Sequence, residues 1–419
     1  MTTSKEYVAF EGGRITESTA YSEDTSTVVD RKDYEYLRDL ALDPVYGHII
    51  KIAVTRDGES LCVGRYAGII PLTSGNVLEI LPKCFSDSCD VGRARYVLCN
   101  MLAQSGYLPK DIFQPIPQTV MKRPLHTLIV THFLIELEKL ILYRLSAMYT
   151  ATVKKRTVLR GKILVQRQLT VREPVPQYFW TQAGEYSENR PENRLIKSSL
   201  ECIALLAKKH EPMRFARIKS FFDNTPASSD IDQDFRSWSN DRLLAHYQNI
   251  KLWCTLILAG TGMSIPGKHA VPSLLYSMER LFEAYVGFCI QKNKQTEYRL
   301  VSQSTRWSLF VQGDQKISVL RPDYLLRKNS KDCCIVDAKW KLLESNNETT
   351  SSDMMQMYTY GRSYLQGQGK LALVYPKTRL FTCASEPYVY SYDTGLSVVC
   401  IPIDLENDPE ELKVFLDSI

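Results

Sequence analysis

The chain has 419 residues, which is too many for one ordinary domain and suits two or three. Hydrophobic residues make up 44%, enough for packed cores, and 52 Lys plus Arg against 47 Asp plus Glu give a formal charge of +5, which is compatible with a nucleic-acid partner without establishing one. No apolar run approaches the roughly 20 residues of a membrane span, residues 1–10 lack the apolar segment of a signal peptide, and the eleven cysteines form no CxxC pair. We therefore expect a soluble protein of the reducing cytoplasm.

Residues 1–30 are polar and rich in Ser, Thr and Glu, so they have little to bury and are expected to form a flexible arm. A short helix is expected over 33–42, where Asp43-Pro44 would end it. Four short β-type runs follow, separated by turn-like residues, at 48–55, 60–63, 68–72 and 77–81. This pattern predicts a β-rich domain over residues 31–120.

Helical spacing of apolar residues appears over 93–105 and, more strongly, over 125–149. The stretch 151–172 then carries seven basic residues and no acidic one. Two interpretations fit it: a surface that faces phosphates or an acidic partner, and a solvated strand face. We expect a helical and basic connecting region over 121–185, and its candidates for DNA binding are Lys154, Lys155, Arg156 and Arg160.

From residue 190 onward, helical and β-type patterns alternate, which predicts a mixed α/β domain over 186–419. The expected helices are 190–209, 241–258, 273–291, 353–365 and 409–416, and the expected strands are 297–303, 307–311, 319–326, 334–338, 371–375, 388–392 and 396–401. Together with the β-rich part, the fold class is α+β or mixed α/β, with a central mixed sheet flanked by helices in the C-terminal domain.

Two adjacent strands of this domain carry the residues that point to chemistry. The apolar runs 318–327 and 333–339 are separated by a polar turn at 328–332, as in an antiparallel strand pair. Asp337 and Lys339 are two apart and therefore project to the same side of their strand. If Asp323 faces the same way, two carboxylates and one lysine converge, an arrangement that can hold a hard divalent cation and place a positive charge near an attacking water.

Other groups have suggestive positions near this trio. Glu283 lies on an otherwise apolar helix face, where it needs a metal or, in the plainer interpretation, a salt-bridge partner. Gln356 and Tyr360 are four apart and share a helix face, either at the site or in a partly buried polar stripe. Residues 262–268 match GxxxxGK, but His269 replaces the Ser or Thr that binds Mg²⁺, so we expect this chain to bind no nucleotide.

The order helix Glu, strand Pro-Asp, strand Asp-Ala-Lys, helix Gln-x-x-x-Tyr resembles the PD-(D/E)XK nucleases of the RecB-like kind. More closely, the chain is similar to the McrC family, the nuclease subunits of the McrBC modified-cytosine restriction system. The segments 64–70 and 78–83 resemble the N-terminal region of that family, and 159–164 and 192–195 resemble its middle. The resemblance covers about residue 49 to the C-terminus, and it implies a restriction-endonuclease-like domain at the C-terminal end.

The resemblance also implies roles for the site residues. Asp323, Asp337 and the carbonyl oxygen of Ala338 would coordinate Mg²⁺, or Mn²⁺ in its place, and Glu283 would support the ion directly or through water. Lys339 would orient or activate the attacking water and offset charge on the phosphate. The remaining pair, Gln356 and Tyr360, would hold the site or the DNA backbone.

A partner is implied as well. In the McrC family, nucleotide hydrolysis belongs to a separate AAA+ GTPase ring, McrB, and the family's N-terminal part enters that ring and stimulates it. The implied function is therefore a Mg²⁺-dependent endonuclease subunit that cuts double-stranded DNA in defence against foreign DNA. Two alternatives remain open: a stand-alone repair or defence nuclease, and a non-catalytic adaptor that activates an AAA+ ring.

Overall fold

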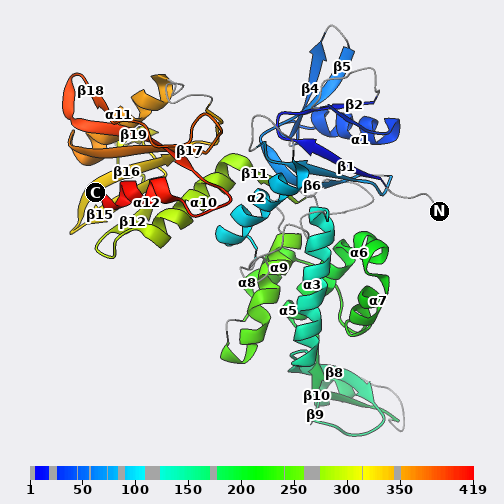
Figure 1. Cartoon of the computed structure of the whole chain (residues 1–419). Helices are drawn as coiled ribbons and strands as arrows, with labels where there is room; N and C mark the ends of the chain where they lie inside the picture. Colours follow the sequence, from blue (N-terminus) through cyan, green and yellow to red (C-terminus); the bar gives the residue numbers. More distant parts are fainter. Residues whose placement is uncertain are drawn as a thin grey trace. The chain divides into compact units, whose positions relative to one another are not determined.

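The protein is described by a computed structural model that covers residues 5–17, 26–44, 46–55, 58–72, 74–83, 90–108, 123–169, 177–239, 241–258, 274–313, 315–343 and 351–419. It is a mixed α+β protein with several sheets (Figure 1). The chain forms two compact units, one made of residues 1–125 together with 273–419 and the other of residues 126–272. These units divide the chain at other points than the four domains expected from the sequence, because the first unit joins segments from both ends of the chain.

The N-terminal part of the first unit contains two sheets of four strands. The first has the order β1 (Glu6–Phe10), β7 (Val77–Leu81), β6 (Tyr66–Pro71) and β11 (Leu274–Ser277). The second has the order β3 (Ser26–Val28), β2 (Arg14–Thr16), β5 (Gly58–Val63) and β4 (Ile50–Thr55), and α1 (Arg31–Leu42) packs against β4 and β5. The predicted helix at 33–42 and the four predicted strands between 48 and 81 are confirmed.

The prediction of a flexible arm is wrong for the described residues 5–17 and 26–30. Strand β1 pairs in parallel with β7, and β2 pairs with both β3 and β5. Alternate residues of β1, Tyr7 and Ala9, are buried, and Ile15 of β2 is fully buried. The polar composition of the segment as a whole concealed these few apolar side chains, of which Tyr7 and Ala9 face the same side of β1.

Strand β11 was also missed, because a helix was expected to start at residue 273. The described part of this segment is a strand antiparallel to β6, followed at once by α10 (Met278–Asn293). The pairing requires Gly68 on β6, which has φ +140° and whose Cβ, if present, would lie 1.7 Å from the carbonyl oxygen of Leu274. A residue with a side chain would therefore separate β6 from β11.

The C-terminal part of the first unit is built on a mixed sheet of six strands. Their order is β12 (Arg299–Ser302), β15 (Tyr324–Lys328), β16 (Lys331–Ala338), β17 (Gly369–Pro376), β19 (Asp393–Ile403) and β18 (Tyr388–Tyr390). Strands β15 and β16 form the expected antiparallel pair, joined by a tight turn in which Asn329 and Ser330 have positive φ. Three helices pack on this sheet: α10, α11 (Ser351–Leu365) and α12 (Glu410–Asp417) (Figure 1).

One predicted strand of this part is divided in two. The run 319–326 was expected to be a single strand, but Val319 ends β14 (Gln315–Val319) and Tyr324 starts β15. Strand β14 pairs instead with β13 (Ser308–Gln312) in a separate sheet of two strands. Pro322 lies between the two strands, and since proline has no backbone N–H to donate, it marks a natural break.

Contacts inside the first unit link the N-terminal sheets to the C-terminal sheet. Helix α2 (Val91–Gln104) starts at Asp90, whose Oδ1 accepts hydrogen bonds from the backbone of Gly92 and Arg93. The guanidinium of Arg93 forms an ion pair with Glu406, which lies after the last strand of the C-terminal sheet. From the N-terminal side, Glu11 accepts hydrogen bonds from the indole nitrogen of Trp340 at 3.0 and 2.8 Å.

The Glu11 carboxyl is buried in this contact, and burial raises its pKa from 4.5 to about 7. Since the folded protein holds this proton more tightly than the unfolded chain does, the stabilisation is complete below pH 4.5 and is lost as the pH rises through 7. We expect Glu11→Gln, which keeps an acceptor for Trp340, to raise the free energy of unfolding by up to about 3 kcal/mol at pH 8 and by little at pH 5. Thermal melting at the two pH values measures this, and an equal effect at both would contradict it.

Between strand β7 of the N-terminal part and helix α2, Glu79 and Arg95 form an ion pair with almost no solvent exposure. Glu79 lies on β7 and Arg95 on α2, and their side chains are joined by hydrogen bonds of 2.9 and 2.5 Å. Glu79 also accepts a hydrogen bond from the backbone N–H of Leu125, which starts α3. The carboxylate therefore has three donors, which fix α2 and Leu125 to the sheet.

The second unit combines helices with a small sheet. The sheet has the order β8 (Met148–Arg156), β10 (Phe179–Ser187) and β9 (Lys162–Ile163). The helices are α3 (Leu125–Leu142), α4 (Val165–Leu169), α5 (Pro191–Cys202), α6 (Ala204–His210), α7 (Pro212–Ser220), α8 (Ile231–Arg236) and α9 (Gln248–Leu258), with a 3₁₀ helix at Arg242–Tyr247. Across the described residues, no helix is both long and apolar enough to cross a membrane.

Some helix boundaries in this unit differ from those expected. The helix predicted over 125–149 ends at Leu142, and Arg144 then has a positive φ of 69°. The residues from Met148 onward form β8, where Tyr, Thr and Val side chains favour a strand. The helix predicted over 190–209 is interrupted at Ile203, and its first part starts with Pro191 in the first turn, as expected.

Candidate active site

The three residues expected at the core of the site meet at the ends of β15 and β16. Asp337 is a buried residue of β16, and its Oδ2 lies 2.7 Å from the Nζ of Lys339, just after the strand. Asp323 directly precedes β15, and its Oδ2 accepts a hydrogen bond from the backbone N–H of Ala338 at 2.8 Å. The side chains of Asp337 and Lys339 thus meet, as the alternation of strand side chains predicted, and Asp323 is held beside them at the start of the neighbouring strand.

Helix α11 holds this trio from one side. The Nζ of Lys339 donates to Oε1 of Gln356 at 2.8 Å, and Nε2 of Gln356 donates to the hydroxyl of Tyr360 at 2.9 Å. That hydroxyl in turn donates to the carbonyl oxygen of Arg321 at 3.2 Å, two residues before Asp323. The predicted pair on one helix face therefore belongs to a chain of hydrogen bonds that returns to the strand with the first carboxylate.

Glu283 lies on α10 and is held by two contacts. Its carbonyl oxygen accepts a hydrogen bond from the hydroxyl of Tyr324 at 2.8 Å, and its Oε1 accepts one from Nε2 of Gln303 at 2.7 Å. Gly287, one turn later, leaves room for the tyrosine, since a Cβ there would lie 2.2 Å from the Tyr324 hydroxyl oxygen. The negative charge of Glu283 contributes to raising the pKa of Asp323, which indicates that the two carboxylates are near each other.

The site concentrates negative charge in a partly buried place. Burial, followed by the charge of Asp337, raises the pKa of Asp323 to about 8. Burial also raises the pKa of Asp337, against the attraction of Lys339. For Lys339, burial lowers the pKa, but the charge and hydrogen bond of Asp337 outweigh it, so the pKa is raised and the ammonium stays protonated near neutral pH. One lysine thus faces several carboxylates that have lost much of their hydration.

The basic residues singled out in the sequence lie in the second unit. Lys154, Lys155 and Arg156 are on β8, and Arg160 follows that strand. The side chains of Lys154 and Arg156 both pair with Glu185 on β10, at 2.7 and 2.6 Å, and their hydrogen bonds lower the pKa of Glu185 to about 2. For these two residues the contacts favour the structural interpretation, in which they stabilise a strand pair. DNA binding by the four residues stays a prediction.

Two residues of the site were not identified from the sequence. Gln303, just after β12, bonds Glu283 through its side chain, and its backbone N–H donates to the carbonyl oxygen of Asp323 at 2.8 Å. Tyr324 supports α10 from β15. A glutamine in a polar run has no distinctive spacing, and the tyrosine resembles any aromatic residue of a buried strand. Only the positive φ of Gln303, 47°, marks it as unusual, and that is a property of the structure.

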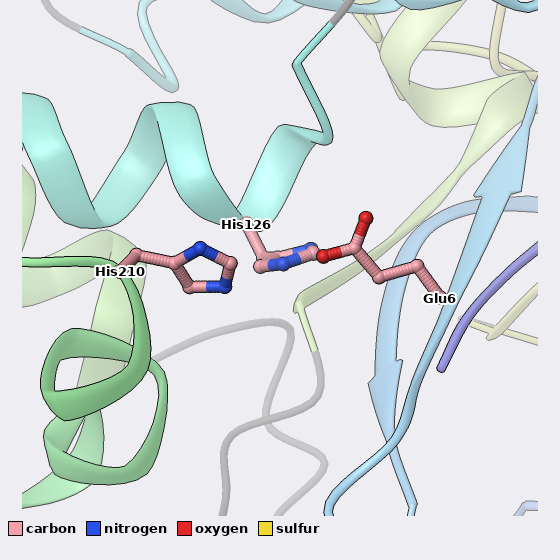
Figure 2. Close-up of side chains that lie close together, drawn as sticks. All are labelled: Glu6, His126 and His210. Atoms are coloured by element: carbon pink, nitrogen blue, oxygen red, sulfur yellow. The ribbon is translucent and has the colours of Figure 1, made fainter. Parts of the chain in front are cut away.

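The other motifs from the sequence lie elsewhere. The GxxxxGK match at 262–268 falls outside the described residues. Of the scattered histidines, His126 at the start of α3 and His210 at the end of α6 come together within the second unit, with ring centroids 5.1 Å apart (Figure 2). Neither residue belongs to the unit that contains Asp323 and Asp337.

Comparisons with solved structures find the same fold in chains of Thermococcus gammatolerans complexes. A chain from the refined half-complex of a tetradecameric assembly of Thermococcus gammatolerans McrB AAA+ hexamers with bound McrC has a TM-score of 0.71 and 16% identity, and the match covers 99% of this chain and 100% of that one. A chain from the cryo-EM structure of the Thermococcus gammatolerans McrBC complex has a TM-score of 0.50 and 14% identity, over 69% of this chain and 88% of that one. At these identities the likeness concerns the fold.

A comparison of sequences is more specific. No curated protein matches the chain. In contrast, the family model described as McrBC 5-methylcytosine restriction system component matches residues 61–376, which include the N-terminal sheet strands β6 and β7 as well as every residue of the candidate site. The match spans well over half of the chain. The chain therefore belongs to the family of McrBC 5-methylcytosine restriction system components.

Proposed function

We propose that this chain is the Mg²⁺-dependent DNA endonuclease subunit of an McrBC-like restriction complex, with a PD-(D/E)XK nuclease domain at its C-terminal end. The observation that supports this most directly is the meeting of Asp323, Asp337 and Lys339 at the ends of two paired strands. Two carboxylates can hold a divalent cation, and a lysine beside them can offset charge on the phosphate, so these groups suit metal-assisted hydrolysis of a phosphodiester. Family membership gives this geometry a DNA context.

The residues present fit a hard divalent cation. Asp323, Asp337 and Glu283 offer carboxylate oxygens, the ligands that Mg²⁺ prefers, and the shared pKa rises of the two aspartates indicate negative charge that a cation would offset. Asp323 and Asp337 would hold the ion with the carbonyl oxygen of Ala338, and Glu283 would do so directly or through water. When bound, Mg²⁺ or Mn²⁺ supplies a Lewis acid that withdraws charge from the phosphate and activates water.

The protein's own groups would position the reactants. The ammonium of Lys339, fixed between Asp337 and Gln356, would orient the attacking water and balance charge that develops on the phosphate. Tyr360 and Gln356 would keep that ammonium in place, since both lie in one hydrogen-bonded chain with it. No side chain would need to form a covalent bond to the DNA.

The partner in this proposal is an AAA+ GTPase ring of the McrB kind. The structurally similar chain from Thermococcus gammatolerans comes from an assembly of McrB AAA+ hexamers with bound McrC, and it is matched over almost the whole of this chain. We assign docking on the ring to the β-rich N-terminal part, and cutting to the C-terminal sheet. The ring would then supply DNA recognition and nucleotide hydrolysis, in defence against foreign DNA.

The test uses the chain with and without its GTPase partner. We expect the assembled complex to cut modified double-stranded DNA with GTP and Mg²⁺, and the chain alone to cut none. Because the GTPase also needs Mg²⁺, metal binding is measured separately, by titrating Mn²⁺ into the chain alone by calorimetry. Stimulated GTP hydrolysis without cutting would make the chain an adaptor, cutting by the chain alone would make it a stand-alone nuclease, and absence of Mn²⁺ binding would contradict the proposed metal.

A further inference from the structure

A cavity adjoins the proposed site on the side of Glu283. It has a volume of about 580 Å³, and its walls include Glu283, Gln303 and Arg321 together with Tyr107, Arg280 and Ser302. Cavities of roughly 300–1,000 Å³ hold small ligands, so this one has room for a group the size of a nucleotide. Its walls are predominantly polar, which suits a charged occupant rather than an apolar one.

Two arginines give the cavity its charge. Arg280 lies one turn before Glu283 on α10, and Arg321 lies two residues before Asp323, so each is close in the chain to a proposed metal ligand. Both side chains are exposed, and Arg280 forms no ion pair with any carboxylate in the described part of the chain. Arginine presents several N–H donors in a planar fork that matches the oxygens of a phosphate.

Gln303 connects one of these arginines to the site. A guanidinium nitrogen of Arg321 donates to Oε1 of Gln303, and Nε2 of the same amide donates to Oε1 of Glu283 at 2.7 Å. The left-handed backbone of Gln303, with φ 47°, is unfavourable for a residue with a side chain. Such conformations persist where the surroundings fix them and are found at ligand sites. The amide therefore ties the wall of the cavity to the position of Glu283.

We propose that this cavity binds a phosphate group of the cut DNA strand, namely the phosphate next to the one at which the strand is cut. Arg280 and Arg321 would be the ligands of this phosphate. The inference rests on the proposed nuclease function and extends it to a second contact along the strand. Phosphate contacts fix the register of a protein on DNA, so a strand anchored here presents the neighbouring phosphate to Asp323 and Asp337. Gln303 is a positioning residue, since it acts through Glu283.

The experiment uses the assembled complex with labelled modified DNA, and with the photo-cross-linker p-benzoylphenylalanine in place of Tyr107. Tyr107 is exposed at the cavity wall and contributes no group to the proposed catalysis. We expect cross-links to DNA from position 107 and none from the matched position Tyr392, which is fully exposed and lies outside the cavity. If the complex cuts DNA but forms no cross-link at position 107, the inference about the cavity is overturned and the proposed function stands. If the complex cuts no DNA, that result counts against the proposed function.

A second measurement asks whether a phosphate is what binds. In Arg280→Gln, we expect the apparent DNA affinity, measured from the cross-linking yield, to fall about ten-fold. The slope of the logarithm of this affinity against the logarithm of salt concentration should decrease in magnitude by about one. Lys413→Gln removes a positive charge from the exposed side of α12 and should change neither. Equal effects in both variants would overturn the inference. The inference would also be overturned if inorganic phosphate bound in a manner that depends on Arg280 while DNA affinity did not depend on Arg280. The cavity would then be a site for free phosphate.

The role of Gln303 has its own readout. Gln303→Ala removes the link to Glu283 but no charge, so we expect DNA affinity to stay within two-fold while Mn²⁺ binding to the chain weakens about ten-fold. Unchanged Mn²⁺ binding in the alanine variant would show that the amide has no positioning role.

Discussion

Replacing Asp337 by Asn is expected to abolish DNA cutting by the assembled complex, with a loss of at least about 1,000-fold in rate. The substitution preserves shape at a buried position but removes the charge that Lys339 and the proposed cation both contact. Stimulation of GTP hydrolysis by the partner should persist, since the N-terminal sheets are untouched. The measurement is a time course of DNA cutting alongside GTP hydrolysis in the same samples.

The control is Asp332→Asn, the same change at another buried carboxylate of strand β16. Asp332 pairs with Arg327 and Arg306, outside the site, so this variant should cut DNA at the wild-type rate. Lys339→Ala should lose activity as Asp337→Asn does, because it removes the positive charge instead. Normal cutting by Asp337→Asn would contradict the assignment of the site, and an equal loss in both asparagine variants would point to damage of the strand.

The second large effect is on stability. Arg95→Ala is expected to lower the free energy of unfolding by about 3–5 kcal/mol, because it leaves the carboxylate of Glu79 buried without its charge partner. The hydrogen bond from the backbone of Leu125 remains, but one neutral donor does not balance a buried charge. Urea unfolding followed by circular dichroism measures the change.

An arginine two residues earlier on the same helix provides the comparison. Arg93 is also paired with a glutamate, Glu406, but its side chain is 46% exposed. Arg93→Ala should therefore cost no more than about 1 kcal/mol, as is usual for ion pairs in contact with water. If the two alanine variants were destabilised equally, burial of the Glu79 pair could not be the cause. Recovery of stability in Glu79→Leu combined with Arg95→Leu would identify the unpaired charge as the origin of the loss.

The core of the candidate site was predictable because it depends on local geometry. Side chains alternate along a strand, so Asp337 and Lys339 had to face one side, and residues four apart share a helix face, so Gln356 and Tyr360 had to lie together. Each of these rules needs only the residue spacing. The meeting of Asp323 with Asp337 also required the antiparallel pairing of β15 and β16, and the polar turn between these strands indicated that pairing.

Contacts between distant parts of the chain were beyond those rules. The bond between Glu11 and Trp340 joins residues 329 apart, and the pairing of β11 with β6 joins segments separated by the whole second unit. Gln303, which bonds Glu283, has a left-handed backbone, a conformation that the residue type alone does not favour. Such features arise from tertiary packing, and no periodicity in the sequence encodes them.

The pairing of β11 with β6 also determines when the protein can be completed during its synthesis. Strands β1, β6 and β7 leave the ribosome early, but the edge of β6 has no partner until residues 274–277 have been made. An unpaired strand edge can pair with other chains, so nascent chains that stop before residue 277 are exposed to aggregation. The last strand of this sheet, β11, continues directly into α10, which carries Glu283, so completion of the N-terminal sheet is followed at once by the start of the C-terminal part.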